Sequence, residues 1–226
     1  MRSMKSNLAT LALLATVAGI ALPSAASATT TLSNVANGGS IGSFGADSSP
    51  TYGQVFQAPI TGKLSSFTLY LNGGVGALFG GVGTWNGTLG FSTGAGSPTN
   101  LYQSASVAAA AAGAYTFSPN IAVTAGQNYV AYLSTVGVGG ASGSTTMPLG
   151  TKTAGLGSFV WNNAGDPRNN GQWDYFADFG TARIDAVFTS AVPEPSTWAL
   201  MILGFGAVGV SMRSSRRRGN LTLAAA

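Results

Sequence analysis

Residues 64–71 read LSSFTLYL, and this stretch decides the fold class of the chain. Phe67, Leu69 and Leu71 fall on one side of an extended backbone, with the more polar residues between them on the other. Alternation with a period of two is typical of a half-buried β-strand. We therefore expect a strand here that places one face against a hydrophobic core.

Similar runs of β-branched and aromatic residues recur along the middle of the chain. They predict further strands at residues 52–56, 87–91, 101–104, 114–117, 129–133, 158–161 and 184–188. Turn-forming residues separate them at 59–62, 72–74, 86–87, 97–98 and 125–126. A sustained helical period is absent between 29 and 191, which argues against crossover helices and a parallel sheet. The predicted fold is all-β: a single antiparallel β-sandwich of jelly-roll type over residues 29–190.

Two segments of this region are harder to assign. Residues 108–112 are all alanine and have high helix propensity, but so short a run does not nucleate a helix in water. The sequence is compatible with either a loop or an edge strand at these residues. Residues 136–144 are rich in glycine and serine, and we expect a long loop there.

The chain changes character at residues 193–199, which read PEPSTWA. Two prolines predict an extended spacer, and Ser196 or Thr197 suits the first turn of a helix that follows. The apolar helix expected over 198–212 has 15 residues and spans roughly 22 Å, short against a hydrocarbon core of about 30 Å. Trp198 suits the headgroup level of a bilayer. We therefore predict a short transmembrane helix.

A basic block follows this helix at residues 213–218, with a tail at 219–226. Its cations resist translocation across a membrane and keep this end in the cytoplasm. They are Arg213, Arg216, Arg217 and Arg218.

The N-terminus has the features of a secretory signal peptide. Arg2 and Lys5 precede an apolar run at 8–22, and Ala26 and Ala28 form the small-residue pattern that signal peptidase accepts. The predicted cut follows Ala28, so that residues 1–28 form the signal peptide. An uncleaved membrane anchor is the alternative.

The order of features over residues 191–218 resembles the PEP-CTERM sorting signal of the PEPxxWA variety. The resemblance is carried by Pro193, Glu194, Pro195, Trp198 and Ala199, and then by the apolar helix and the arginines. It implies a Gram-negative protein that the secretion machinery exports through the inner membrane. An integral-membrane protease, exosortase, would recognise the tail, and the protein would reach the cell surface or the exopolysaccharide matrix of a biofilm.

The region before the sorting signal also resembles the β-sandwich domains that accompany this signal. The similarity lies in residues 54–59, 64–71, 101–104 and 125–133.

The charge of the chain belongs to its targeting segments. The formal net charge is +4, yet residues 29–191 carry four basic side chains against five acidic ones. The high isoelectric point therefore arises from basic residues in the targeting segments, and it does not indicate a nucleic-acid-binding protein.

The amino-acid composition excludes most of the common catalytic mechanisms. The chain has no histidine and no cysteine, which excludes the usual serine triads, thiol nucleophiles and common zinc hydrolase sites. A GxGxxG pattern at 204–209 lies inside the apolar tail, and a GxSxG pattern at 38–42 has no imidazole to serve it. We expect a protein that is not an enzyme.

Aspartates gather late in the chain, and three interpretations of them stay open. Asp166, Asp174 and Asp178 supply oxygen ligands of the kind that calcium takes, although their spacing is not that of an EF-hand. A pair of them would suit a glycosidase. They are also ordinary turn formers, and apart from calcium we expect no cofactor.

Three tryptophans sit beside amide or acid side chains near expected loops: Trp85, Trp161 and Trp173. Such pairs bind sugars, because the ring covers the apolar face and the polar group meets the hydroxyls. Tryptophan also fills sandwich cores. The function expected first is a non-enzymatic surface or matrix protein sorted by exosortase. A carbohydrate-binding module is second, and a glycoside hydrolase third.

Overall fold

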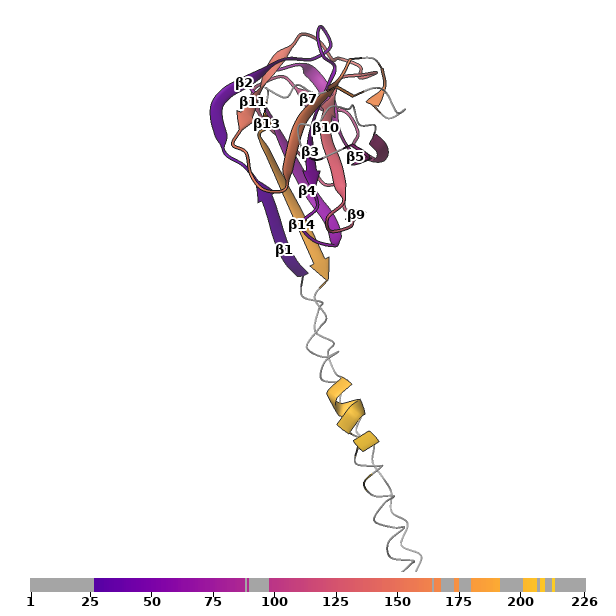
Figure 1. Cartoon of the computed structure of the whole chain (residues 1–226). Coiled ribbons are helices and arrows are strands. Elements are labelled where there is room, and N and C mark those ends of the chain that lie inside the picture. Colours follow the sequence, from indigo (N-terminus) through magenta and orange to yellow (C-terminus); the bar gives the residue numbers. More distant parts are fainter. Residues whose placement is uncertain are drawn as a thin grey trace, which may run out of the picture. The chain divides into compact units, whose positions relative to one another are not determined.

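The computed structural model describes residues 27–87, 89, 98–163, 165–167, 173–174 and 180–191, and in the tail 201–206, 208–209 and 213. The chain divides into two compact units, Ser27–Val192 and a terminal unit made of Met1–Ala26 with Pro193–Ala226. The first unit is built from antiparallel strands (Figure 1), which confirms the all-β class.

The strands form three sheets. The five-stranded sheet has the order β1-β14-β4-β8, with β9 also on β4, and its strands are β1 (Ser27–Ser33), β14 (Ile184–Ala191), β4 (Gly62–Leu71), β8 (Gly113–Phe117) and β9 (Ile121–Val123). The six-stranded sheet has the order β12-β3-β10-β5-β6, with β7 also on β5, and its strands are β12 (Leu156–Asn162), β3 (Thr51–Gln57), β10 (Asn128–Ser134), β5 (Gly76–Trp85), β6 (Pro98–Gln103) and β7 (Val107–Ala109). The three-stranded sheet has the order β13-β11-β2, from β13 (Thr181–Ala182), β11 (Thr145–Gly150) and β2 (Ala36–Phe44).

The stretch LSSFTLYL lies in β4 and alternates as its sequence predicts. Phe67, Leu69 and Leu71 are buried, and the residues between them are half-buried. The strand pairs with β14 on one side and with β8 on the other, so it is a central strand of its sheet.

Most expected strands are present with ends shifted by a few residues: β3, β6, β8, β10, β12 and β14. The strand expected at 87–91 is not seen in its described residues, since Gly87 and Leu89 form bends. The alanine run contributes its first two residues to the edge strand β7, and residues 136–144 form a loop as expected.

The small third sheet is a departure from the two-sheet sandwich that the sequence predicts. Its strands β2 and β11 pair with a bulged register. Ile41, Phe44 and Met147 on these strands join the main core, so the third sheet extends the same hydrophobic cluster. The small sheet thus contributes apolar side chains to the core that the two larger sheets share.

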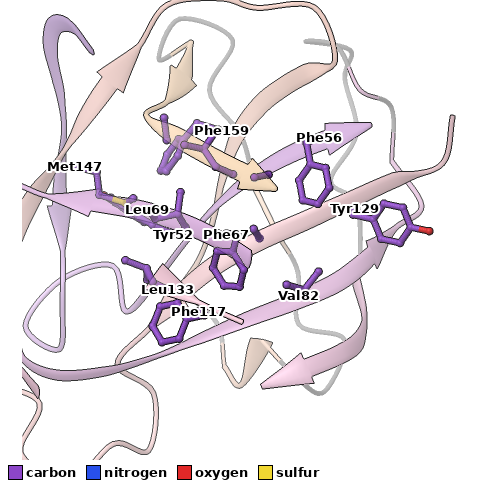
Figure 2. Close-up of a cluster of buried hydrophobic side chains, with 14 of the residues drawn as sticks. Tyr52, Phe56, Phe67, Leu69, Val82, Phe117, Tyr129, Leu133, Met147 and Phe159 are labelled. Carbon is purple, nitrogen blue, oxygen red and sulfur yellow. The ribbon is translucent and has the colours of Figure 1, made fainter. Parts of the chain in front are cut away.

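The core lies in two clusters on opposite faces of the six-stranded sheet. The first fills the space between the two larger sheets and includes Phe56, Phe67, Phe117 and Leu133 (Figure 2). Apart from Trp173, which lies outside the strands, the second consists of alternate residues of the six-stranded sheet, because successive side chains of a strand point to opposite faces. Its members are Val55, Phe79, Trp85, Val130, Tyr132, Val160 and Trp173.

Candidate functional site

Most residues of the tail motif lie outside the described part of the chain. This holds for residues 193–199 and 216–218, and at the other end for Ala26. Ala28 lies in β1, where it pairs with Ser190 of β14. A cut after Ala28 would therefore leave Thr29–Ser33 of β1 paired with β14. The position of the cut stays a prediction.

The described part of the tail is helical at residues 201–206, 208–209 and 213. Its exposed apolar side chains are Met201, Ile202, Leu203, Phe205 and Val208. A soluble surface helix buries one apolar stripe, so exposure of nearly every apolar residue is unusual in water. Within the described residues, no helix is both long and apolar enough to cross a membrane.

Two of the three tryptophans are core residues. Trp173 is 0% exposed and Trp85 is 7% exposed. The Trp173 ring packs edge-on against Trp85 at 6.2 Å and against Tyr132 at 5.5 Å between centroids. Neither indole offers a free face to a sugar. For these two residues the structure corrects the glycan-binding interpretation, and the reason is packing against the outer face of the six-stranded sheet.

Trp161 differs from the other two tryptophans because it is half-buried and borders a cavity of about 230 Å³. The cavity lies between β2 and β12, which are edge strands of their sheets in the described part of the chain. We call it the Trp161 pocket, and its walls are Ile41, Gly42, Ser49, Tyr52, Phe159, Trp161 and Asn163.

The aromatic wall of the Trp161 pocket is held rigidly. Trp161 stacks on Phe159 with ring centroids 6.0 Å apart, and Phe159 meets Tyr52 edge-on at 4.8 Å. Trp161 also exchanges two backbone hydrogen bonds of 2.9 Å with Asp174, and on its other side it pairs with Tyr52 of β3. The Trp161 ring therefore loses little conformational entropy when a ligand binds.

The polar groups of the Trp161 pocket are uncharged. Burial raises the pKa of the Tyr52 phenol, and a hydrogen bond with Ser49 opposes that rise. Asn163 is exposed at the rim and brings a carboxamide. Among the residues that the structure describes, the lining holds no carboxylate, lysine or arginine. The described lining can thus hydrogen-bond to a neutral polar ligand, and its own side chains offer no charge to pair with an ion.

The aspartates expected to bind calcium are only partly described. Asp166 is half-buried, Asp174 is exposed, and Asp178 lies outside the described residues. Among the residues that the structure describes, no group of three or more acidic side chains is placed to hold a metal ion. The calcium site stays a prediction.

Tyr70, Arg183 and Asp185 form a polar cluster that sequence reasoning missed. The Tyr70 hydroxyl donates a short hydrogen bond to Asp185, and the Arg183 guanidinium carbon lies 3.8 Å from the centre of the Tyr70 ring. Burial raises the pKa of Tyr70, and the neighbouring Asp185 carboxylate raises it further. The sequence did not show this cluster because it depends on the register between β14 and β4. In that register Asp185 pairs with Thr68, which lies two residues before Tyr70 on β4.

Residues 191–218 match the family described as PEP-CTERM protein-sorting motif. The chain carries a PEP-CTERM sorting motif. The presence of this motif supports the conclusion that the protein is exported and that exosortase sorts it to the surface. No curated protein matches the chain, and no solved structure does.

The residues of the sorting motif could be predicted because they are contiguous in the sequence. Those of the Trp161 pocket are not, since they come from β2, β3, β12 and the segments beside them. The sequence signal available was Trp161 next to an asparagine pair, which marked one wall of the pocket.

Proposed function

We propose that this chain is a non-enzymatic surface or exopolysaccharide-matrix protein of a Gram-negative bacterium, exported with a signal peptide and sorted by exosortase. The observation that carries the proposal is the sorting motif at residues 191–218. The exposed apolar helix within it supports the same conclusion, because such a helix suits lipid and is costly in water.

The order of events follows from the two ends of the chain. The signal peptide starts export, and the apolar helix with Arg213 and the following arginines stops it, so that the β domain faces away from the cytoplasm. The helix then presents the proline spacer to exosortase at the membrane. The absence of histidine and cysteine from the sequence supports a role without catalysis.

Intact-mass measurement of the protein in fractionated cells of a bacterium that has exosortase tests the sorting proposal. We expect the surface form to lack the apolar helix and the arginines. Double substitution of Pro193 and Pro195 by alanine should leave an unprocessed form in the membrane fraction. The matched control is Ser196→Ala with Thr197→Ala at the variable positions of PEPxxWA, which should be processed normally. Surface protein that retains the complete tail would contradict the proposal.

A second candidate function, binding to extracellular polysaccharide, is favoured by the Trp161 pocket. Its aromatic wall and neutral polar rim have the chemistry that sugar recognition uses. Retention of the exported protein on polysaccharide purified from the same cells tests this function, and free passage through such a matrix would count against it.

Calcium binding is a separate prediction from the sequence. If Asp166, Asp174 and Asp178 bind it, the melting temperature of the exported protein should rise on adding calcium and fall with a chelator.

A further inference from the structure

We infer that the Trp161 pocket is a binding site for a single neutral pyranose ring. This inference rests on the second proposed function, polysaccharide binding, and names the site and the ligand class. The ring would lie against the wall formed by Trp161 and Tyr52, and its hydroxyls would meet Asn163 and Ser49 at the rim.

The size of the pocket suits a ligand of one ring. Its volume of about 230 Å³ lies below the range of roughly 300–1,000 Å³ that is usual for drug-sized ligands. An oligosaccharide could therefore place one unit in the pocket while the rest of the chain stays outside. A terminal residue or a side branch of a polymer has this geometry.

The lining selects a neutral sugar. None of the described lining residues carries a positive charge, and an anionic sugar buried without a cation loses hydration that these residues do not replace. A purely apolar ligand would leave the Ser49 hydroxyl and the Asn163 carboxamide facing a surface that cannot hydrogen-bond. A pyranose ring offers an apolar C–H face to the indole and hydroxyls to the rim.

The wall of the pocket is already formed. Tyr52 is fixed between Phe44 at 5.4 Å and Phe159 at 4.8 Å, measured between ring centroids. Trp161 is stacked on Phe159 and tied by its backbone to Asp174. Binding therefore costs little side-chain entropy on the protein side, which favours measurable affinity for a small ligand.

The test uses the exported protein and follows the indole N–H resonances by NMR during titration with methyl glycosides of glucose, galactose and mannose. We expect at least one of them to shift the Trp161 resonance with a Kd of roughly 1 mM. Trp161→Ala should weaken binding at least tenfold, and Trp161→Phe should recover part of that loss because a ring is restored. Galacturonic acid should bind at least tenfold more weakly than galactose at neutral pH.

Asn163→Ala keeps the test informative if the Trp161 variants fold poorly, because Asn163 is exposed. It should weaken binding severalfold. The matched control is Gln127→Ala, an exposed carboxamide in the turn before β10, which should bind as the unchanged protein does.

The outcomes separate this site from the wider proposal. Sugar binding that survives both the Trp161 and the Asn163 changes would overturn the site. Binding of cyclohexanol with no response to any neutral glycoside would overturn the ligand class. If the glycosides bind but the protein passes freely through polysaccharide, the site stands and the matrix function fails.

Discussion

At the scale of single residues, Gln54 and Asn34 join strands from different sheets. The Gln54 carboxamide donates to the Gly157 carbonyl at 2.8 Å and accepts from the Ala182 amide at 2.7 Å, and its side chain is fully buried. Asn34 similarly accepts from the Ile184 amide at 2.9 Å and donates to the Ala182 carbonyl at 3.1 Å. Both side chains hydrogen-bond to backbone N–H and C=O groups that have no partner where the regular strand pairing ends.

Gln54→Leu keeps the volume of the side chain and removes these hydrogen bonds. We expect the free energy of unfolding to fall by about 2–4 kcal/mol, because the Ala182 amide becomes buried and unpaired and the Gly157 carbonyl keeps only the long bond of 3.4 Å from the Thr181 hydroxyl. Urea denaturation measures the change. Gln57→Leu on the same strand loses one exposed hydrogen bond to Gly126 and should cost less than about 1 kcal/mol. Equal costs at the two positions would contradict the role given to Gln54.

At the scale of an element, β5 shows why a glycine-rich stretch forms a strand. Its sequence GALFGGVGTW has too little β propensity to be predicted from composition. Two of its glycines make room for rings on opposite faces of the sheet. A Cβ on Gly80 would lie 2.4 Å from the Phe117 ring, and one on Gly81 would lie 2.1 Å from the Tyr132 ring. The glycines are needed for packing, and burial of those rings stabilises the strand.

Gly81→Ala should therefore destabilise the domain by about 2–3 kcal/mol, since the Tyr132 ring must move within a packed cluster. Gly113→Ala on β8 is the matched control. A Cβ there meets nothing within 4 Å, and the substitution should leave stability unchanged or raise it by up to about 1 kcal/mol. Thermal unfolding followed by circular dichroism compares the two variants. A neutral Gly81→Ala would show that the ring has free space.

At the scale of the whole molecule, pairing in the β domain is almost entirely non-local. In the described part of the chain, β5 and β6 are the only hydrogen-bonded neighbours that are also consecutive strands. β1 pairs with β14, so the two ends of the domain lie side by side. This closes the domain at Ala191, where the sorting motif begins, and both described core clusters lie within it.

Removal of residues 193–226 should consequently change the melting temperature of the β domain by less than about 2 °C, which corresponds to less than about 1 kcal/mol for a domain of this size. Differential scanning calorimetry provides the comparison. A cut that also removes residues 184–191 takes away β14 from between β1 and β4 and should abolish cooperative unfolding. A large shift from the first cut alone would mean that the tail packs on the domain.

Alkaline pH should weaken the domain through its tyrosines. Burial raises the pKa of Tyr52, Tyr70 and Tyr102 above the ordinary value of about 10. The folded state therefore holds these protons more tightly than the unfolded state does. The resulting stability is fully present below about pH 10 and is lost as pH rises through the raised values. Urea midpoints at pH 8 and pH 11 should show the loss, and Tyr52→Phe should reduce it. Midpoints independent of pH would contradict this account.

Several features of this protein follow from the sequence by itself. The sorting motif is contiguous, and its chemistry depends on composition and order alone, so residues 191–218 could be assigned without a structure. β4 could also be predicted, because one of its faces is buried and the other is not, which imposes a period of two on its residues. The strands β3 and β10 are buried on both faces, yet their aromatic content still marked them.

Tertiary structure alone decided the rest. β5 is a strand because distant rings cover its glycines, and the third sheet joins the core through Ile41, Phe44 and Met147. Trp85 and Trp173 have sequence neighbours much like those of Trp161, yet they are buried in a cluster on the outer face of a sheet while Trp161 borders a cavity. What separates them is which strands are paired, and that pairing joins residues far apart in the chain, where local sequence carries no information about contact.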